Sequence, residues 1–341
     1  MALMEDQLQE GAPAGALSLV PFWSRPTRTR VINGLLDYGV LLVVIALFIY
    51  FSFASPYFLS VQNLLNVAYA ASITGILAVG ITIALIAGQL DLSIGAMVGL
   101  TTVIIATGEA THGLSYGVAI ALAVVAAMIV GLINGFLVVN VGINSIIVTI
   151  AMLGVVTAAG QVVAVGQTIP LGDISLTHVV NARAAGVPVT VILMALVYVA
   201  AYIGLTQTRL GWHIYAAGGN PSAAQRAGIR VGSLYRFVFL LTAGLSVVGG
   251  IVTAGRAASG GATYGETLNI DVLTAVLLGG IGLGGGSGRI ERTLVGVLLI
   301  GILDNGLVLI NVTSYYQQAA TGVIFVVAVV MAAVRAKRMS R

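Results

Sequence analysis

The sequence contains no cysteine, and its single lysine, Lys337, lies near the C-terminal end. Without cysteine the chain cannot form disulfide bonds, thiolate metal sites or a thiol nucleophile. A phosphate-binding P-loop requires a lysine immediately before its Ser or Thr, and no lysine stands in such a position. The sequence therefore predicts that the chain does not hydrolyse ATP with a P-loop of its own.

Charged residues are also scarce. They make up 8% of the 341 residues, whereas hydrophobic residues make up 59%. In soluble domains about a quarter of the residues are charged. Apolar runs of roughly 20 residues, the length at which a helix crosses a bilayer, recur along the chain. The chain is therefore predicted to be an all-α, polytopic membrane protein.

Patterns typical of metal sites are missing. His112, His178 and His213 lie in three separate segments, and no H-E-x-x-H pattern occurs. The glycines at 280–285 match a dinucleotide-binding fingerprint in form, but they end an apolar stretch and lack the flanking strand and helix. We interpret them as a site of close backbone approach or a helix break. No catalytic residue, metal site or bound cofactor is expected.

About ten transmembrane helices are predicted from the apolar segments. These segments are residues 35–53, 65–87, 94–107, 116–139, 145–165, 189–205, 237–254, 271–283, 293–310 and 319–334. The third and eighth are short, and polar or glycine-rich runs at 88–95 and 284–288 adjoin them, so broken or partly re-entrant helices are expected. Residues 166–188 are predicted to form an external loop.

Basic residues gather at one set of segment ends. They are Arg25, Arg28, Arg30, Arg209, Arg226, Arg230, Arg236, Arg289, Arg292, Arg335, Lys337, Arg338 and Arg341. Short loops rich in Lys and Arg stay cytoplasmic, and an even number of spans puts both termini there. The predicted domains are a cytoplasmic tail (1–33), a transmembrane domain (34–335) and a second cytoplasmic tail (336–341). Because the basic residues are dispersed, they do not form the patch that nucleic-acid binding requires.

One internal repeat is visible. Residues 134–141 (NGFLVVNV) match residues 305–312 (NGLVLINV) without a gap. In the predicted topology the two copies cross the membrane in opposite directions. This is the relation expected of inverted-repeat halves, here the second to fifth spans against the seventh to tenth. Chance similarity within a Leu/Val/Gly alphabet is the alternative.

The longest polar segment within the transmembrane domain is 206–236. Asn220 is a favourable N-cap, Pro221 suits the first helical position, and residues 222–227 can form a short helix. Gly228 then stands where helices often end in the left-handed conformation. The segment therefore predicts a short cytoplasmic helix that a soluble partner can contact.

Polar side chains inside the apolar segments are candidates for a translocation path. A carboxylate at bilayer depth costs on the order of 2.5–3.5 kcal/mol, so it usually faces a cavity or a partner, as expected for Asp91 and Asp304. The path candidates are Gln89, Asp91, Asn134, Asn144, Thr149 and Asn305. As alternatives, Asp91 and Asp271 can cap helices at the membrane interface. Asn and Gln side chains often hydrogen-bond between helices instead of binding a ligand.

Taken together, five segments resemble the permease subunits of bacterial ABC sugar importers of the ribose, xylose, arabinose and galactofuranose kind. The resemblance covers about Asn63 to Ala333. The segments are 88–95 (GQLDLSIG, similar to the family's GGIDLSVG), 134–152, 217–229 (AGGNPSAAQRAGI), 279–286 (GGIGLGGG) and 305–307 (NGL).

The resemblance implies a pore of two permease chains, either two copies or two paralogues, in the bacterial inner membrane. It further implies two cytoplasmic subunits that bind and hydrolyse ATP with Mg²⁺, and a periplasmic sugar-binding protein. The short helix in 206–236 is then the coupling helix that docks on the ATPase. Carried over by residue, the coupling positions are Gly218, Gly219, Asn220, Pro221, Ala224, Arg226, Gly228 and Ile229.

The sequence departs from the family pattern at a few positions. They are Gln89 in place of a glycine, Asn144-Ser145 in place of Pro-Phe, Asn269 in place of a glutamate, and Gly282 and Gly284 in place of serines. We expect differences in the pore lining first at Gln89 and Asn144. Two other functions stay open: a related permease for a nucleoside, a branched-chain amino acid or a furanosyl signal, and a stand-alone channel.

Overall fold

The computed structural model describes the backbone of residues 27–339 and the side-chain surroundings of residues 39–333. The protein is mostly helical, at 77%. The α-helices are α1 (Thr27–Ala54), α2 (Val61–Ile86), α3 (Ile94–Ala110), α4 (Tyr116–Phe136), α5 (Ser145–Val163), α6 (Ser175–Asn181), α7 (Val189–Gln207), α8 (Arg209–Gly219), α9 (Pro221–Arg226), α10 (Val231–Ala257), α11 (Glu266–Leu278), α12 (Ile290–Leu309) and α13 (Ser314–Met339). A π-helical turn, η1 (Leu137–Val141), continues α4.

The predicted count of about ten spans is not confirmed. Seven helices of the described chain are long and apolar enough to cross a membrane: α2, α4 with η1, α5, α7, α10, α12 and α13. The other three predicted spans fall on α1, whose described apolar part is 16 residues from Gly39 to Ala54, and on the 17-residue α3 and 13-residue α11. Hydropathy marks these segments as apolar, but it does not measure how far a buried helix travels across the bilayer.

Helices α1 and α13 extend beyond the predicted spans. Helix α1 begins at Thr27, within the predicted 1–33 tail, and α13 runs to Met339, within the predicted 336–341 tail. A helix of 28 residues, as in α1, is about 42 Å long and exceeds the hydrocarbon thickness of about 30 Å. Residues 1–26 and 340–341, which make up the rest of the predicted tails, lie outside the described residues.

Helix α2 forms the centre of the fold. Its most apolar window is 89% buried, compared with 22% for α5 and 17% for α13. Helices α7, α10, α11 and α12 all pack against it. Close packing is possible because α2 carries small residues: a Cβ at Gly80 lies 3.2 Å from Leu245 of α10. The exposed, apolar faces of α5 and α13 therefore form the outside of the protein.

The helices pair in a pattern that repeats. Helix α2 packs on α12 as α10 packs on α4, and α10 packs on α3 as α2 packs on α11. Likewise α3 packs on both α4 and α5, and α11 packs on both α12 and α13. If α2, α3, α4 and α5 are exchanged with α10, α11, α12 and α13 in that order, the same pairs of helices remain in contact. Two structurally related halves require this. The repeated sequence lies at the ends of α4 and α12, and the inversion of the halves across the membrane stays a prediction.

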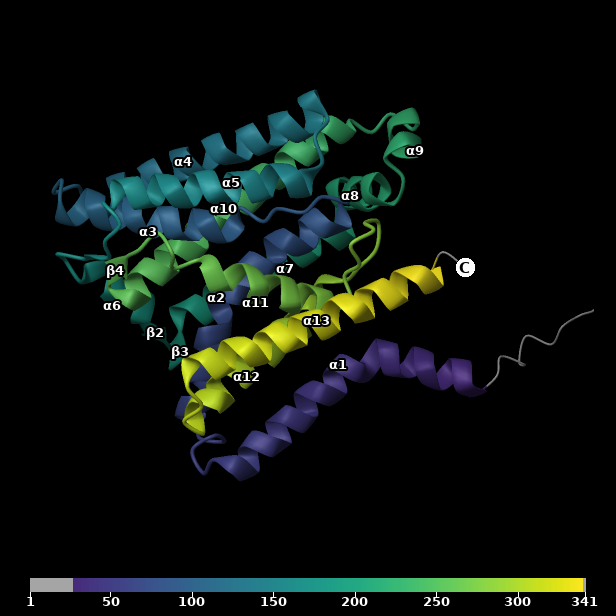
Figure 1. The fold of residues 1–341 in the computed structure, drawn as a ribbon, viewed down its shortest axis with the longest axis horizontal. Helices are drawn as coiled ribbons and strands as arrows, with labels where there is room; N and C mark the ends of the chain where they lie inside the picture. Colours follow the sequence, from purple (N-terminus) through teal and green to yellow (C-terminus); the bar gives the residue numbers. More distant parts are fainter. Residues whose placement is uncertain (1–26, 340–341) are drawn as a thin grey trace, which may run out of the picture.

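The two ends of the molecule differ (Figure 1). At one end lie α8, α9, the start of α1 and the end of α13. At the other lie α6 and four two-residue strands, β1 (Ile169–Pro170), β2 (Arg183–Ala184), β3 (Val187–Pro188) and β4 (Ser259–Gly260). They form two antiparallel pairs, β1 with β4 and β2 with β3. The predicted loop 166–188 is thus partly ordered as helix and strand, because its backbone groups find partners within and beyond the segment.

Candidate functional site

The polypeptide between α2 and α3 is an extended break buried within the protein. Its carboxylate, Asp91, is only 2% exposed, so Asp91 does not lie at the protein surface. One carboxylate oxygen accepts hydrogen bonds from the amide nitrogen of Ser93, at 2.9 Å, and from the Ser93 hydroxyl. The other accepts from the Thr242 hydroxyl of α10, and Asn134 of α4 donates to Ser93 Oγ at 3.1 Å. The break is thereby fixed to two other helices.

The start of α5 holds the same break from another side. The Leu90 amide donates to Ser145 Oγ at 3.2 Å, and Thr149 Oγ1 lies 3.3 Å from the Leu90 carbonyl oxygen. Thr149 is fully buried and also donates to the Ser145 carbonyl at 2.8 Å. Asp91, Asn134 and Thr149, three of the predicted path residues, therefore lie together at the break and anchor it. Their direct contact with a transported molecule stays a prediction.

A polar cavity of about 410 Å³ adjoins this break. It is lined by Gly88, Gln89, Val138, Val139, Ile143, Asn144, Ser145, Gln225, Val231, Gly232 and Tyr235. Two predicted path residues, Gln89 and Asn144, thus line one cavity. The exposed Asn144 also caps α5, since its side-chain oxygen accepts from the Ile146 amide at 2.9 Å. No charged residue is among those that line the cavity, so its polar groups are amides and hydroxyls.

The predicted short helix is present as α9, from Pro221 to Arg226. Asn220 is its N-cap: the side-chain oxygen accepts from the Ala223 amide and the Ser222 hydroxyl, each at 2.9 Å. Pro221 occupies the first turn, and Gly228 follows with φ 87°, as predicted. Most of the segment is exposed, including Arg226, whereas Ala224 is 5% exposed and Ile229 is half-buried.

The rest of segment 206–236 is more ordered than predicted. Helix α8 precedes α9, and α10 begins at Val231 rather than at 237. Thr208 caps α8 by accepting from the Gly211 amide at 3.3 Å, a Ser/Thr start signal that the sequence reasoning passed over.

Three glycine-containing segments meet at the end of α8. A Cβ added at Gly218 would lie 1.8 Å from the Ile86 carbonyl oxygen, at the end of α2. The same oxygen accepts a hydrogen bond of 2.8 Å from the Gly286 amide, in the loop after α11. Gly285 and Gly286 have φ of 72° and 69°, which side chains disfavour. The glycine run thus allows close backbone approach, as interpreted from the sequence, and it joins α8 to α2.

Asn305 does not join the other path candidates. Its side chain exchanges two hydrogen bonds with Asn63 at the start of α2, of 3.0 and 3.1 Å. Asn63 also donates to the Phe58 carbonyl at 3.0 Å. The alternative of an interhelical hydrogen bond therefore fits Asn305, which links α2 to α12.

A second polar cavity, of about 300 Å³, lies among α11, α12 and α13. Asp271 and Asp304 line it with Thr267, Ile270, Ser314, Gln317, Gln318 and Thr321. Asp304 therefore faces a cavity, as expected of a carboxylate at bilayer depth, and so does Asp271. Within the described chain, no three His, Asp or Glu side chains gather closely enough to bind a metal ion.

At the end opposite α9, the carboxylates of Glu109 and Asp173 hold residues 172–175 in place. Glu109 of α3 accepts from the amides of Gly172, at 2.7 Å, and Asp173, at 2.9 Å. Hydrogen bonds from the Ser175 hydroxyl and amide hold the pKa of the Asp173 carboxyl below its usual range. These bonds connect α3 to the segment that carries α6.

The sequence reasoning missed several members of the site, among them Ser145, Gln225, Thr242 and Tyr235. Ser145 and Gln225 stand inside segments that were singled out, next to residues that were chosen. The sequence offered one indication for Thr242, which is that it places a hydroxyl group within an apolar span.

Comparison with known proteins agrees with the resemblance. Residues 63–332 match the family described as branched-chain amino acid transport system / permease component. The ribose import permease protein RbsC of Escherichia coli (strain K12) is 33% identical over 301 residues, which cover 87% of this chain and 94% of the relative. RbsC of Bacillus subtilis (strain 168) is 36% identical over 295 residues, covering 86% and 91%. The L-arabinose transport system permease protein AraH of Escherichia coli (strain K12) is 30% identical over 323 residues, 94% of both chains.

No solved structure matches the chain. The family match spans most of the sequence, and the relatives align over nearly their whole lengths. The chain therefore belongs to the branched-chain amino acid transport system / permease component family, as a multi-pass membrane permease similar to ribose and arabinose import permeases.

Proposed function

We propose that the chain is the transmembrane permease subunit of an ATP-binding-cassette importer for a small pentose- or hexose-like sugar. A periplasmic binding protein delivers the sugar, and partner subunits bind ATP and Mg²⁺ and hydrolyse ATP. The protein lies in the bacterial inner membrane with α9 and both termini on the cytoplasmic side. The names of the ribose and arabinose permeases support this assignment.

The observation that carries the proposal is the direct connection between α9 and the polar cavity. Gln225 belongs to α9 and lines the cavity together with Gln89 and Asn144. Gly218, two residues before the Asn220 cap, packs on the last carbonyl of α2, immediately before the break. A displacement of α9 by a docked ATPase therefore moves one wall of the cavity and the end of the central helix.

The chemistry of the cavity fits an uncharged polyol. Sugar hydroxyls donate and accept hydrogen bonds, which Gln89, Asn144, Ser145 and Tyr235 can complement. A charged substrate in such a cavity would lack an ionic partner among these residues and would be costly to desolvate.

Short, capped helices suit the transmission of motion. The Asn220 cap and the Pro221 start fix α9 as a rigid body, and the buried Ala224 packs it against the protein. Rigid-body shifts of such an element change packed contacts in steps, which is how nucleotide-driven closure in a partner opens or closes a path.

A second permease chain, identical or paralogous, completes the pore. Helices α5 and α13 supply the apolar faces for it, since only 22% and 17% of their most apolar windows are buried within one chain. A face of this kind contacts either lipid or another membrane protein.

Transport of a branched-chain amino acid is the second candidate, because the family description names that substrate class. A zwitterionic amino acid requires partners for its ammonium and carboxylate groups. The uncharged cavity beside the break therefore favours the sugar.

Purification of the tagged chain from its native membrane tests the assembly. We expect an ATPase subunit and a binding protein to be encoded beside it and the ATPase to co-purify in stoichiometric amount, which mass spectrometry measures. Ligand identification on the binding protein then distinguishes a sugar from an amino acid. A chain that purifies without any ATPase from gently solubilised membranes would contradict the proposal.

A further inference from the structure

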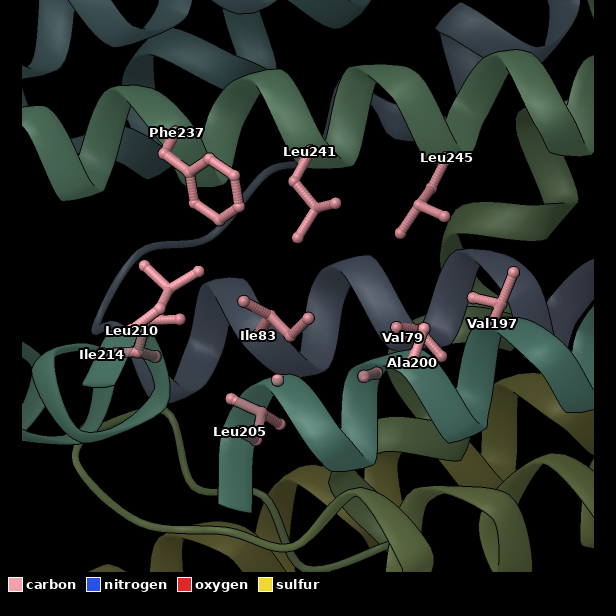
Figure 2. Close-up of a pocket in the computed structure, with 12 residues that line it drawn as sticks. Val79, Ile83, Val197, Ala200, Leu205, Leu210, Ile214, Phe237, Leu241 and Leu245 are labelled. Carbon is pink, nitrogen blue, oxygen red and sulfur yellow. The ribbon is translucent and has the colours of Figure 1, made fainter. Parts of the chain in front are cut away.

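A third cavity differs from the two polar ones because every residue that lines it is apolar (Figure 2). It measures about 300 Å³ and lies among α2, α7, α8 and α10. The lining residues are Val79, Ile83, Val197, Ala200, Ala201, Gly204, Leu205, Leu210, Ile214, Phe237, Leu241 and Leu245. We call this cavity the α7/α10 crevice. It offers no hydrogen-bonding side chain to a sugar.

The crevice has a buried floor and an exposed mouth. Ile83 of α2 and Leu205 of α7 are 6% and 4% exposed, whereas Leu210 and Phe237 are each 39% exposed. Phe237 projects from α10 across the crevice toward α2 and α8 (Figure 2). Helices α7 and α10 both pack on α2, and the crevice separates their side chains above it. The mouth therefore opens at the outer surface of the helices.

The surface around the mouth is apolar, as a surface that contacts lipid is. On α7, Leu196, Val199 and Ile203 are 61%, 55% and 44% exposed. Helix α7 is one of the helices long and apolar enough to cross the membrane. In a membrane such a surface is surrounded by acyl chains. An acyl chain is therefore the molecule that most often meets the mouth of the crevice.

Helix α8 places a polar edge beside the same mouth. Leu210 and Ile214 line the crevice, and Arg209 and His213 each stand one residue earlier, on the adjoining stripe of the helix. Arg209 is exposed and makes no hydrogen bond or ion pair with the residues that the structure describes. Trp212 is 72% exposed, and Trp with Arg is the pairing that anchors helices at the lipid headgroup level.

We propose that the α7/α10 crevice binds one acyl chain of an anionic phospholipid, whose phosphate is bound by Arg209. The apolar lining takes the chain, and the exposed guanidinium takes the charge of the headgroup. The lipid belongs to the leaflet on the α8 side, which is the cytoplasmic one in the orientation proposed above. Because α8 ends at the Asn220 cap, the bound lipid braces the helix that leads into α9.

Two variants test the parts of the site separately. Gly204 lines the crevice, and a Cβ added there meets no atom within 4 Å, so Gly204→Leu can start a side chain at the crevice wall without a clash at its Cβ. Gly117→Leu is the matched control. A Cβ added at Gly117 of α4 also meets no atom within 4 Å, but Gly117 lies outside the crevice. Arg209→Gln removes the charge, and Arg230→Gln removes another exposed arginine that stands before α10 as its control.

Native mass spectrometry of the purified chain, titrated with phosphatidylglycerol or phosphatidylcholine of identical acyl chains, measures the bound lipid. We expect the unsubstituted chain to retain one phosphatidylglycerol tightly. In Gly204→Leu the affinity for this lipid should fall about tenfold or more, because the leucine side chain displaces several methylenes of the acyl chain. Arg209→Gln should weaken the binding of phosphatidylglycerol about fivefold and leave the binding of phosphatidylcholine unchanged. Both controls should behave as the unsubstituted chain.

Three results overturn the proposal. Equal retention of the two lipids by the unsubstituted chain contradicts an anionic headgroup site. Retention by Gly204→Leu that equals retention by Gly117→Leu contradicts an acyl chain in the crevice. Retention of free fatty acid in preference to phosphatidylglycerol contradicts the phospholipid as occupant.

Discussion

Asp91 is a carboxylate inside a membrane domain, and hydroxyl and amide donors surround it rather than a basic residue. Ser93 supplies two donors to one oxygen, and Thr242 supplies the donor to the other. A buried carboxylate requires such donors, because an unpaired charge in an apolar interior is costly. At this scale the site depends on single hydroxyl groups that hold the break between α2 and α3.

Replacement of Thr242 by valine should destabilise the protein. The change keeps the shape of the side chain but leaves the second Asp91 oxygen without its donor, at a cost of about 1.5–3 kcal/mol in the free energy of unfolding. Thermal or denaturant unfolding of the purified chain measures it. Thr253→Val on the same helix is the control, since its hydroxyl only donates to the Gly249 carbonyl at 2.8 Å within α10. An equal loss of unfolding free energy in both variants would contradict this account of Asp91.

Replacement of Gly218 by alanine should be more damaging than the same change at Gly219. The Gly218 Cβ would lie 1.8 Å from the Ile86 carbonyl oxygen, whereas the Gly219 Cβ would lie 3.8 Å from its nearest neighbour, Gly286 Cα. Backbone shifts of this kind cost on the order of 1–3 kcal/mol. Unfolding midpoints and the yield of monodisperse protein compare the two variants. Similar midpoints for both would mean that α8 does not pack on α2 as described.

At the scale of elements, the start and end of α9 are determined by residues of its own segment, and the helix makes few contacts with the rest of the protein. Its start is determined by Asn220 and Pro221 and its end by Gly228, all residues of its own segment. An exposed helix of six residues is not stable by length, so the caps determine whether it forms. The element that meets the ATPase in our proposal is therefore sensitive to one side chain.

Replacement of Asn220 by alanine should reduce coupling while leaving the fold stable. Losing the N-cap costs about 1 kcal/mol of helix stability, and α9 contributes little to the buried core. In a reconstituted complex, sugar uptake per ATP hydrolysed should fall several-fold. Asn220→Ser retains a capping oxygen and should restore most of the coupling. Equal uptake per ATP for the alanine and serine variants would show that the cap does not matter.

Local signals predicted α9 well, because capping residues act on neighbours within three or four positions. The same reasoning could not find Thr242, whose hydrogen bond to Asp91 spans 151 positions of sequence. Nor could it foresee the hydrogen bond between Asn305 and Asn63, because nothing in the sequence identifies Asn63, 242 positions away, as a partner. The span count stays unconfirmed for a related reason. Hydropathy identifies α3 and α11 as apolar but cannot tell a short buried helix from one that crosses the bilayer.

For the whole molecule, the arrangement is a central helix, α2, packed among two sets of helices with matching contacts, and the polar break and its cavity lie beside α9. In our proposal the energy for directed transport comes from a partner, which fits the lack of a P-loop lysine in the sequence. The cavity reaches α9 directly, and the opposite end is ordered by Glu109 and α6. We therefore propose that the cavity belongs to a translocation path and that α9 is the helix through which an ATPase moves it.

Uptake of radiolabelled ribose or arabinose into liposomes tests this account most directly. The chain is reconstituted either alone or with its ATPase and binding protein, each with and without ATP. The account predicts no ATP hydrolysis and no uptake by the chain alone, and ATP-dependent accumulation above the external concentration by the complete complex. Rapid sugar flux through liposomes that contain only this chain, without ATP or partners, would contradict the account and identify a channel.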